Sequence, residues 1–411
     1  MLKKSVLLCL SIAVLFSSLF IVAAYAAPVD NTAYDDATVM KIMNNTTISG
    51  LKAKGAVLID FDSGMVLQEQ NSNEKLPLAS VTKVMSMLLI MEAIDTGRIS
   101  LDSEVTVSDH SADTKGTSVW LEAGEVFTVT ELLKAVSIRS ANDATVALAE
   151  AVAGSEEAFV AMMNEKAAEL GMKNTNFLDC SGLTDVGHYS TAYDVALMSR
   201  ELLHKYPQIT EYTKTWQAKF RENVPGKKPI DLDNTNKLVR FYDGTVGLKT
   251  GYTEAAGHCL SASAVRNGQQ LISVVLGEPD SNTRFAESRK LLDYGFANFE
   301  TSQVNSKGEV IQEVQVKKGL PPTTNVIYKE DVKLLLKKGE KGKIERTVNI
   351  KADLVAPVKA GQKIGEVTYM ISGEEVGRAD LVASNHVQKA SFLKIFYSMV
   401  QEWFGMGRTS K

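Results

Sequence analysis

The sequence is poor in the residues that bind metals or form disulfides. Only three cysteines and five histidines occur among 411 residues, and no group of them has the spacing of a metal site. We therefore expect neither a metal centre nor another cofactor. Cys9 lies in the apolar N-terminal segment, which leaves Cys180 and Cys259. The sequence does not decide whether these two form a disulfide or remain free thiols.

The chain also lacks a large excess of charge of either sign. Its formal net charge is −4, with 23% charged and 45% hydrophobic residues. This composition is typical of a globular protein and excludes a disordered or collagen-like chain. It gives no electrostatic reason to expect nucleic acid as a partner. The length predicts more than one domain.

The N-terminus has the pattern of an export signal over residues 1–26. Lys3 and Lys4 precede an apolar run from Val6, and the small-residue tripeptide Ala24-Tyr25-Ala26 predicts cleavage after Ala26. The alternative is an uncleaved membrane anchor, because the apolar run is long for a signal. Both interpretations place the remaining chain outside the cytoplasm.

Residues 27–300 have the pattern of an α+β domain. Alternating apolar residues predict strands near both ends, and apolar residues three and four apart predict helices in the middle and at the end. Asn267-Gly268 is a hairpin signal between two of the strands. Asn142 and Ser155 stand where helix N-caps are expected. These patterns predict an antiparallel sheet with a helical subdomain.

The pattern changes after residue 300. Residues 301–383 consist of short alternating runs, which predict a small all-β domain. Residues 384–411 predict a terminal amphipathic helix that lies on a membrane surface. The alternative is a terminal helix docked on the β domain. The apolar face comprises Phe392, Leu393, Ile395, Phe396, Met399, Val400, Trp403 and Phe404, opposite Lys389, Lys394, Arg408 and Lys411.

A Ser-x-x-Lys pattern occurs four times, but only Ser80-Lys83 opens a long predicted helix. Residues three apart share one face of a helix, so the Lys83 amine could take the proton of the Ser80 hydroxyl. Burial or nearby cations would lower the lysine pKa enough for that task. The free N–H groups of a helix N-terminus would favour an oxyanion formed there. The alternative is that Ser80 only caps the helix.

Two further patterns favour catalysis. Ser140-Ala141-Asn142 is the only Ser-x-Asn, in a predicted break between helices, and Lys249-Thr250-Gly251 is the only Lys-Thr-Gly, on a predicted strand. Lys249 and Thr250 offer a cation and a hydroxyl to an anionic group, and Gly251 would leave room for a substrate backbone. Singly, Asn142 could be a helix cap, Lys249 an exposed strand lysine and Thr250 an ordinary strand residue.

The ordered set resembles the active-site serine penicillin-recognising enzymes, and most closely the D-alanyl-D-alanine carboxypeptidases, or low-molecular-mass penicillin-binding proteins. The stretches that carry this resemblance are "LASVTKVMS", "SIRSANDA" and "GLKTGYTEAAGHCLSASA". It implies a serine β-lactamase/DD-peptidase-like catalytic domain, a small β-rich domain and a terminal membrane helix. It also implies a peptidoglycan stem peptide as substrate and β-lactams as inhibitors. The expected location is the outer face of the cytoplasmic membrane.

The resemblance assigns the following roles. Ser80 would attack the carbonyl of the penultimate D-alanine with Lys83 as base, and Ser140 would relay a proton to the leaving amine. Asn142 would hold the substrate backbone. Lys249 and Thr250, followed by Gly251, would bind the terminal carboxylate. The backbone N–H groups of Ser80 and Tyr252 would form the oxyanion hole.

Other functions fit the sequence less well. A class A β-lactamase would need a Glu-x-x-Leu-Asn pattern after the second motif, and none occurs between Asn142 and Lys249. A non-catalytic penicillin sensor or cell-wall binding protein could retain the serine and deacylate slowly. A D,D-endopeptidase would differ in admitting a second peptide to its cleft. A Ser-His-Asp hydrolase is disfavoured because no Gly-x-Ser-x-Gly elbow occurs.

Overall fold

The computed structural model describes residues 50–184, 186–222, 226–391, 396 and 400. The predicted export signal and most of the predicted terminal helix lie outside these residues. Within the described part, no helix is both long enough and apolar enough to cross a bilayer.

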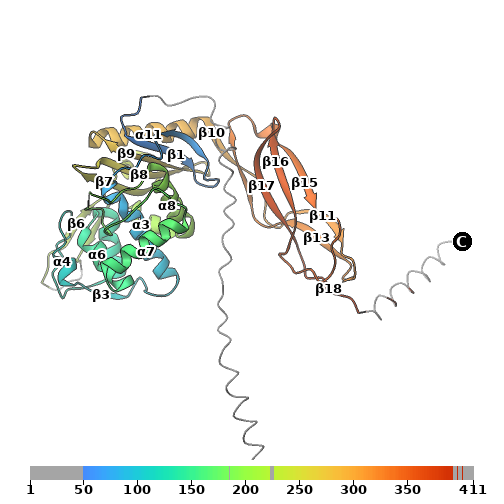
Figure 1. Ribbon diagram of the computed structural model, residues 1–411, viewed down its shortest axis with the longest axis horizontal. Coiled ribbons are helices and arrows are strands. Elements are labelled where there is room, and N and C mark those ends of the chain that lie inside the picture. Colours follow the sequence, from blue (N-terminus) through green and yellow to red (C-terminus); the bar gives the residue numbers. More distant parts are fainter. Residues whose placement is uncertain (1–49, 185, 223–225, 392–395, 397–399, 401–411) are drawn as a thin grey trace, which may run out of the picture. The chain divides into compact units, whose positions relative to one another are not determined.

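The first folded part contains a five-stranded antiparallel sheet, as the α+β prediction expects. Its strand order is β2-β1-β9-β8-β7 (Figure 1). Strands from both ends of this part therefore meet in one sheet. Asn267 and Gly268 have φ angles of 51° and 80°, as a tight two-residue hairpin requires. The strands are β1 (Gly55–Asp60), β2 (Val66–Gln70), β7 (Thr245–Thr253), β8 (Gly257–Arg266) and β9 (Gln269–Glu278).

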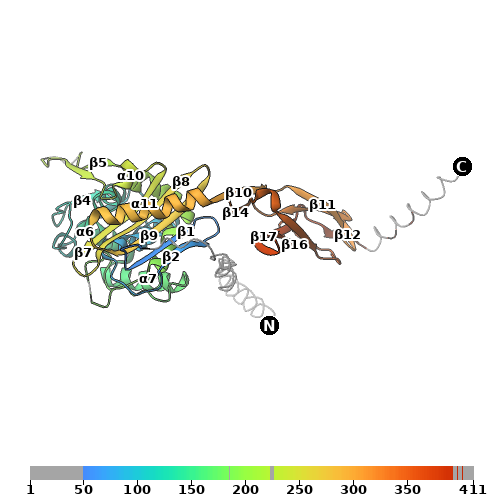
Figure 2. The same ribbon diagram turned by 90° about the horizontal axis from the view of Figure 1, so that it is seen from above.

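Helices cover both faces of this sheet. Figures 1 and 2 show α11 (Ser281–Asn298) along one face, and the helical subdomain with α3 (Lys83–Asp95) and α8 (Ala192–Lys205) on the other. Helix α3 is buried along nearly its whole length, so the turn that begins it is held firmly in place. The other helices are η1 (Ala79–Thr82), α4 (Asp109–Ala112), α5 (Val129–Lys134), η2 (Ala135–Arg139), α6 (Asn142–Ala153), α7 (Glu156–Glu169), η3 (Pro207–Ile209), α9 (Thr210–Thr213) and α10 (Leu238–Phe241).

Two short hairpins complete this part. Strand β3 (Glu104–Thr106) pairs with β4 (Val126–Thr128), and β5 (Gln217–Phe220) pairs with β6 (Ile230–Asp233). The residues that follow β6 pass beside the third sequence motif on β7, because Thr250 Oγ1 donates a hydrogen bond to Thr235 Oγ1.

The C-terminal folded part is all-β, as predicted, and has a hydrophobic core of its own. A five-stranded antiparallel sheet has the order β11-β13-β17-β16-β15, and two strand pairs, β10-β14 and β12-β18, accompany it. The elements are β10 (Phe299–Asn305), β11 (Val310–Gln315), β12 (Gly319–Leu320), β13 (Thr323–Tyr328), β14 (Val332–Lys337), η4 (Lys341–Lys343), β15 (Glu345–Ile350), β16 (Lys363–Ile371), β17 (Glu374–Ala383) and β18 (Gln388–Lys389).

The predicted end of the β domain at residue 383 is too early. Val387 is fully buried in the domain's core, and β18 pairs with β12. The Ala390 N–H donates to the Lys318 carbonyl at 2.8 Å. Lys389 therefore belongs to a strand, and any terminal helix begins after residue 390.

Candidate active site

Ser80 lies in the 3-10 turn η1, directly before helix α3. The N-caps of η1 and α3 are Leu78 and Thr82, and neither makes a side-chain capping bond. Ser80 is therefore not the helix cap that was the alternative. Its Oγ lies 3.0 Å from Lys83 Nζ, one turn along the chain. The first motif thus brings hydroxyl and amine into hydrogen-bond distance.

Lys83 is fully buried and held from three directions. Its Nζ donates to Asn142 Oδ1 at 2.6 Å and to the Ser181 carbonyl at 2.7 Å, in addition to its contact with Ser80. Burial lowers the pKa of Lys83 to about 8, against the smaller opposing effects of Cys180 and nearby aspartates. A neutral amine has two hydrogens and one lone pair. If the two hydrogens bind the two carbonyl-type oxygens, the lone pair is left facing the Ser80 hydroxyl.

The second motif follows the π-helical turn η2. Ser140 has a left-handed backbone, with φ 68° and ψ 30°, an uncommon conformation for a residue other than glycine. Asn142 begins α6, and its Nδ2 donates to the Lys115 carbonyl at 2.7 Å. The prediction that Asn142 is an N-cap is wrong, because Ala141 has that position and the Asn142 amide is occupied by Lys83 and Lys115. The predicted Ser155 cap is confirmed, since its side chain accepts from the Ala158 N–H.

The third motif lies on strand β7. Lys249 is 1% exposed, so the alternative of an exposed strand lysine is wrong. Its Nζ donates to the Thr250 carbonyl at 3.0 Å. Burial, together with the positive charges of Lys83 and Arg284, holds the pKa of Lys249 well below its usual range. Lys249 and Arg284 are thus two buried basic side chains that affect each other electrostatically, which favours an anionic ligand beside them.

Gly251 is required for a reason other than the predicted one. A Cβ there would lie 2.7 Å from the Leu78 carbonyl oxygen and 3.0 Å from the Ser80 nitrogen. The glycine therefore lets β7 approach the chain's own nucleophile turn, whereas the sequence had suggested room for substrate. This contact brings the first and third motifs together.

Tyr252 follows at the edge of the same strand. Its ring is more than half exposed and stacks on His258 with ring centroids 4.4 Å apart. The predicted role of Tyr252 uses only its backbone N–H, so that role does not involve the exposed ring. Burial and the Arg284 charge lower the pKa of His258, which favours a neutral partner for this stack.

Sequence reasoning missed several groups that support the site. The Ser181 carbonyl had no sequence signal, since every residue has one. The Arg284 guanidinium is buried and donates to the Gly251 carbonyl at 3.0 Å, which fixes β7 from behind. Cys180 and Cys259 are both buried free thiols, which settles the question that the sequence left open.

Comparison with known proteins agrees with this geometry. A family model described as D-alanyl-D-alanine carboxypeptidase matches residues 41–280, and one described as penicillin-binding protein 5, C-terminal domain, matches residues 299–389. The chain belongs to the D-alanyl-D-alanine carboxypeptidase family. It is 43% identical to the D-alanyl-D-alanine carboxypeptidase DacF of Bacillus subtilis (strain 168), over 86% of this chain and 90% of that protein.

Solved structures support the same conclusion. Penicillin-binding protein 5 of Haemophilus influenzae has 32% identity and a TM-score of 0.74, covering 84% of this chain and 100% of that one. Penicillin-binding protein D2 of Listeria monocytogenes, solved in an ampicillin-bound form, has 32% identity and a TM-score of 0.54, covering 60% of this chain and 98% of that one. This carboxypeptidase is therefore a serine-type hydrolase of the penicillin-binding protein class.

Proposed function

We propose that this carboxypeptidase removes the terminal D-alanine from peptidoglycan stem pentapeptides through an acyl-enzyme on Ser80. The Ser80 oxygen attacks the carbonyl of the penultimate D-alanine as the Lys83 amine takes its proton. Ser140 passes a proton to the nitrogen of the departing D-alanine, and the amide bond breaks. Water then hydrolyses the ester, which releases the shortened peptide and restores Ser80.

The observation that carries this proposal is the environment of Lys83. Its amine lies 3.0 Å from Ser80 Oγ, and its other two contacts are oxygen acceptors. Because burial lowers the pKa of Lys83 to about 8, a useful fraction is neutral near neutral pH. An ordinary surface lysine would be almost entirely protonated there and could not accept the serine proton.

The remaining site residues would hold the substrate. Lys249 and Thr250 would bind the terminal carboxylate, and the N–H groups of Ser80 and Tyr252 would receive the oxyanion. The Asn142 amide would contact the peptide backbone through the second hydrogen of Nδ2, since the first is donated to the Lys115 carbonyl. The carboxylate of a β-lactam would occupy the same position. The drug would then acylate Ser80 and act as an inhibitor.

Mass spectrometry of the purified full chain in detergent tests the proposal. Wild type and Ser80→Ala are each given benzylpenicillin and then diacetyl-Lys-D-Ala-D-Ala. The proposal requires a penicilloyl adduct on the Ser80 peptide and release of one D-alanine by wild type only. An adduct without D-alanine release would favour a penicillin sensor or an endopeptidase that needs a cross-linked substrate. Rapid penicillin turnover without peptide cleavage would favour a β-lactamase.

We also propose that the enzyme is exported and works at the outer face of the cytoplasmic membrane. The support is in the sequence: the Ala24-Tyr25-Ala26 cleavage pattern, and the one-sided apolar and aromatic residues between 392 and 404. In this proposal, residues 391–411 form a helix that lies in the membrane interface and retains the enzyme there.

Deletion of residues 391–411 tests the anchor. This deletion starts beyond β18 and Ala390, so it leaves the β domain intact. The truncated enzyme should move from the membrane pellet to the soluble fraction and keep its carboxypeptidase activity. Continued pelleting would instead indicate an uncleaved N-terminal anchor, which N-terminal sequencing of the purified protein would detect.

A further inference from the structure

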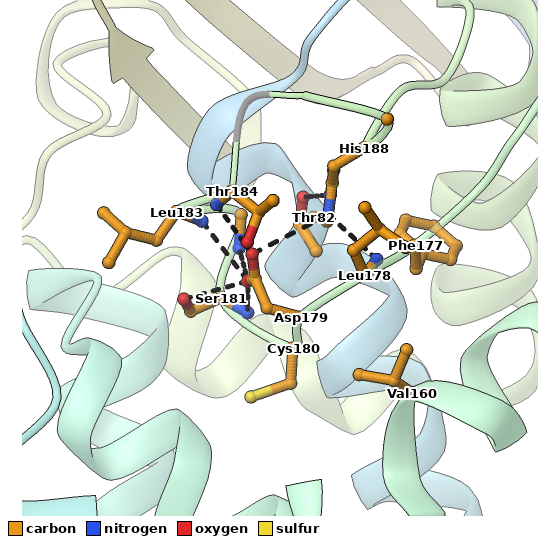
Figure 3. Close-up of polar contacts among 12 residues, drawn as sticks. Thr82, Val160, Phe177, Leu178, Asp179, Cys180, Ser181, Leu183, Thr184 and His188 are labelled. Atoms are coloured by element: carbon orange, nitrogen blue, oxygen red, sulfur yellow. Dashed lines mark hydrogen bonds and ion pairs between the residues drawn. The ribbon is translucent and has the colours of Figure 1, made fainter. Parts of the chain in front are cut away.

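One loop beside the site is organised by a single carboxylate. Asp179 Oδ1 accepts hydrogen bonds from the N–H groups of Ser181 at 2.7 Å, Gly182 at 2.5 Å and Leu183 at 3.2 Å. Its Oδ2 accepts from the Thr184 N–H at 2.7 Å. Figure 3 shows the residues Ser181, Leu183 and Thr184 around this carboxylate. Asp179 thus fixes the orientation of four successive peptide groups.

The loop that Asp179 organises, residues 181–184, makes two contacts with the nucleophile region. The Ser181 carbonyl accepts from Lys83 Nζ at 2.7 Å. Gly182, with φ 80°, lies so close to the turn before Ser80 that a Cβ there would be 1.9 Å from the Ala79 carbonyl oxygen. The 181–184 loop therefore packs directly against the backbone that carries Ser80. The same loop also binds Lys83, the proposed base.

The Asp179 carboxylate is charged under all conditions in which the enzyme would work. Burial alone would raise the pKa of Asp179, but the hydrogen bonds that its carboxylate accepts, first of all from Thr184 and Ser181, lower it to about 2. His188 Nδ1 lies 3.8 Å from Asp179 Oδ2 and also accepts from the Leu178 N–H at 3.1 Å. An Nδ1 that accepts leaves the ring hydrogen on Nε2, which lies 2.8 Å from Thr82 Oγ1.

We propose that Asp179 is a positioning residue for the Ser80–Lys83 pair. Its carboxylate orients the 181–184 loop so that the Ser181 carbonyl binds one hydrogen of the Lys83 amine and directs the lone pair of that amine toward Ser80. Asp179 does not touch the reacting atoms, and acts through the Ser181 peptide group. The inference rests on the proposed role of Lys83 as the base for acylation.

The electrostatic surroundings predict how this role can be measured. The negative charges of Asp179 and Asp143 oppose the lowering of the Lys83 pKa that burial causes. Removing the Asp179 charge should therefore lower the pKa of Lys83 further. A displaced Ser181 carbonyl would also lower the pKa of Lys83, because the carbonyl would no longer accept a hydrogen bond from the protonated amine and stabilise it.

The experiment compares Asp179→Asn with wild type in the full chain, by the rate of acylation with benzylpenicillin as a function of pH. We expect the plateau rate to fall by about 10- to 100-fold, because a displaced base loses its alignment with the nucleophile. We also expect the midpoint of the acid limb to move to lower pH. A purely structural role would reduce the amount of active protein but leave that midpoint where it is in wild type.

Asp60→Asn is the matched control. Asp60 is another aspartate that holds a turn: its buried carboxylate accepts from the Ser63 N–H at 2.8 Å and the Ser63 hydroxyl at 2.7 Å, neither of which belongs to the site. This variant should lose stability without a change in the midpoint. A wild-type rate and midpoint in Asp179→Asn, or an equal effect of Asp60→Asn, would overturn the proposal.

Asp179→Glu keeps the charge but moves the carboxylate. This variant can be measured if Asp179→Asn does not fold. Its acylation should fall while the midpoint stays closer to that of wild type. If Asp179→Asn does not fold and Asp179→Glu is acylated at the wild-type rate, Asp179 serves folding alone. That result would refute the inference. Failure of wild type to be acylated on Ser80 would instead refute the proposed function.

Discussion

Replacing Gly251 by alanine should test the contact that joins the first and third motifs. The new Cβ would lie 2.7 Å from the Leu78 carbonyl oxygen, 3.0 Å from the Ala79 Cβ and 3.0 Å from the Ser80 nitrogen, all shorter than ordinary van der Waals contacts. Two of the three atoms belong to backbone, so side-chain rotation cannot relieve the overlap. Strand β7 and the Ser80 turn must therefore separate, by roughly half an ångström or more in a close-packed interior.

That separation should lower the free energy of unfolding and should reduce the rate of acylation even more strongly. Overpacking of this kind destabilises proteins by about 1–3 kcal/mol, which lowers the melting temperature of a domain this size by several degrees. A displacement of about 1 Å can reduce a catalysed rate about 100-fold. We therefore expect Gly251→Ala to be acylated at least about tenfold more slowly than wild type, because the two N–H groups proposed for the oxyanion hole move apart.

The assay is the second-order rate of labelling by a fluorescent penicillin, measured beside thermal unfolding. Gly342→Ala is the matched control, since a Cβ at Gly342 meets no atom within 4 Å and its backbone has no positive φ. It should match wild type in both measurements. Wild-type labelling and melting in Gly251→Ala would refute the reasoning.

Three further predictions follow from the buried titratable groups. Lys83→Arg should reduce acylation by at least about 100-fold, because a guanidinium stays protonated and cannot act as base; a near-normal labelling rate would exclude Lys83 as the base. In wild type, the rate of acylation should rise with a midpoint near the pKa of Lys83, which burial lowers to about 8; a midpoint at the 10.5 of an ordinary lysine would contradict this. Burial and the neighbouring Glu287 raise the pKa of Glu278 to about 9, so the folded state retains a proton that the unfolded chain has released. This stabilising contribution is complete below the ordinary glutamate pKa of 4.5 and is lost progressively as pH rises from there to about 9, by at most about 1.4 kcal/mol per pH unit. Urea unfolding of Glu278→Gln should show a weaker pH dependence than wild type, and identical slopes would argue against this proton.

The parts of the fold that the sequence predicts are those with strong local signals. Asn267-Gly268 predicts a hairpin because both residues tolerate the positive φ that the turn needs. The strands near both ends of the catalytic part, and the longer helices in its middle and at its end, follow from apolar periodicity, whereas the short hairpins β3-β4 and β5-β6 were not predicted. The three motifs could be recognised because each is a short pattern of chemically distinctive residues in a predicted setting.

The features that the sequence could not predict are non-local. Ala79 and Ser140 have φ angles of 49° and 68°, which tertiary contacts impose on residues that do not favour them. The reason for Gly251 depends on a turn about 170 residues earlier in the chain, and the Ser181 carbonyl is a backbone group without a residue signature. Asn142 was misassigned as a cap because its true partners, Lys83 and Lys115, are distant in sequence.

The three contacts of Lys83 have a practical consequence for anyone who handles this enzyme. They join residues separated by 3, 59 and 98 positions in the chain. An incompletely folded molecule would lack at least one of them and would retain an unreactive serine. The amount of protein that penicillin labels covalently should therefore equal the amount of native protein in the sample. The fraction of a sample that binds the drug would report refolding yield, storage damage or chaperone assistance without any need for a peptide substrate.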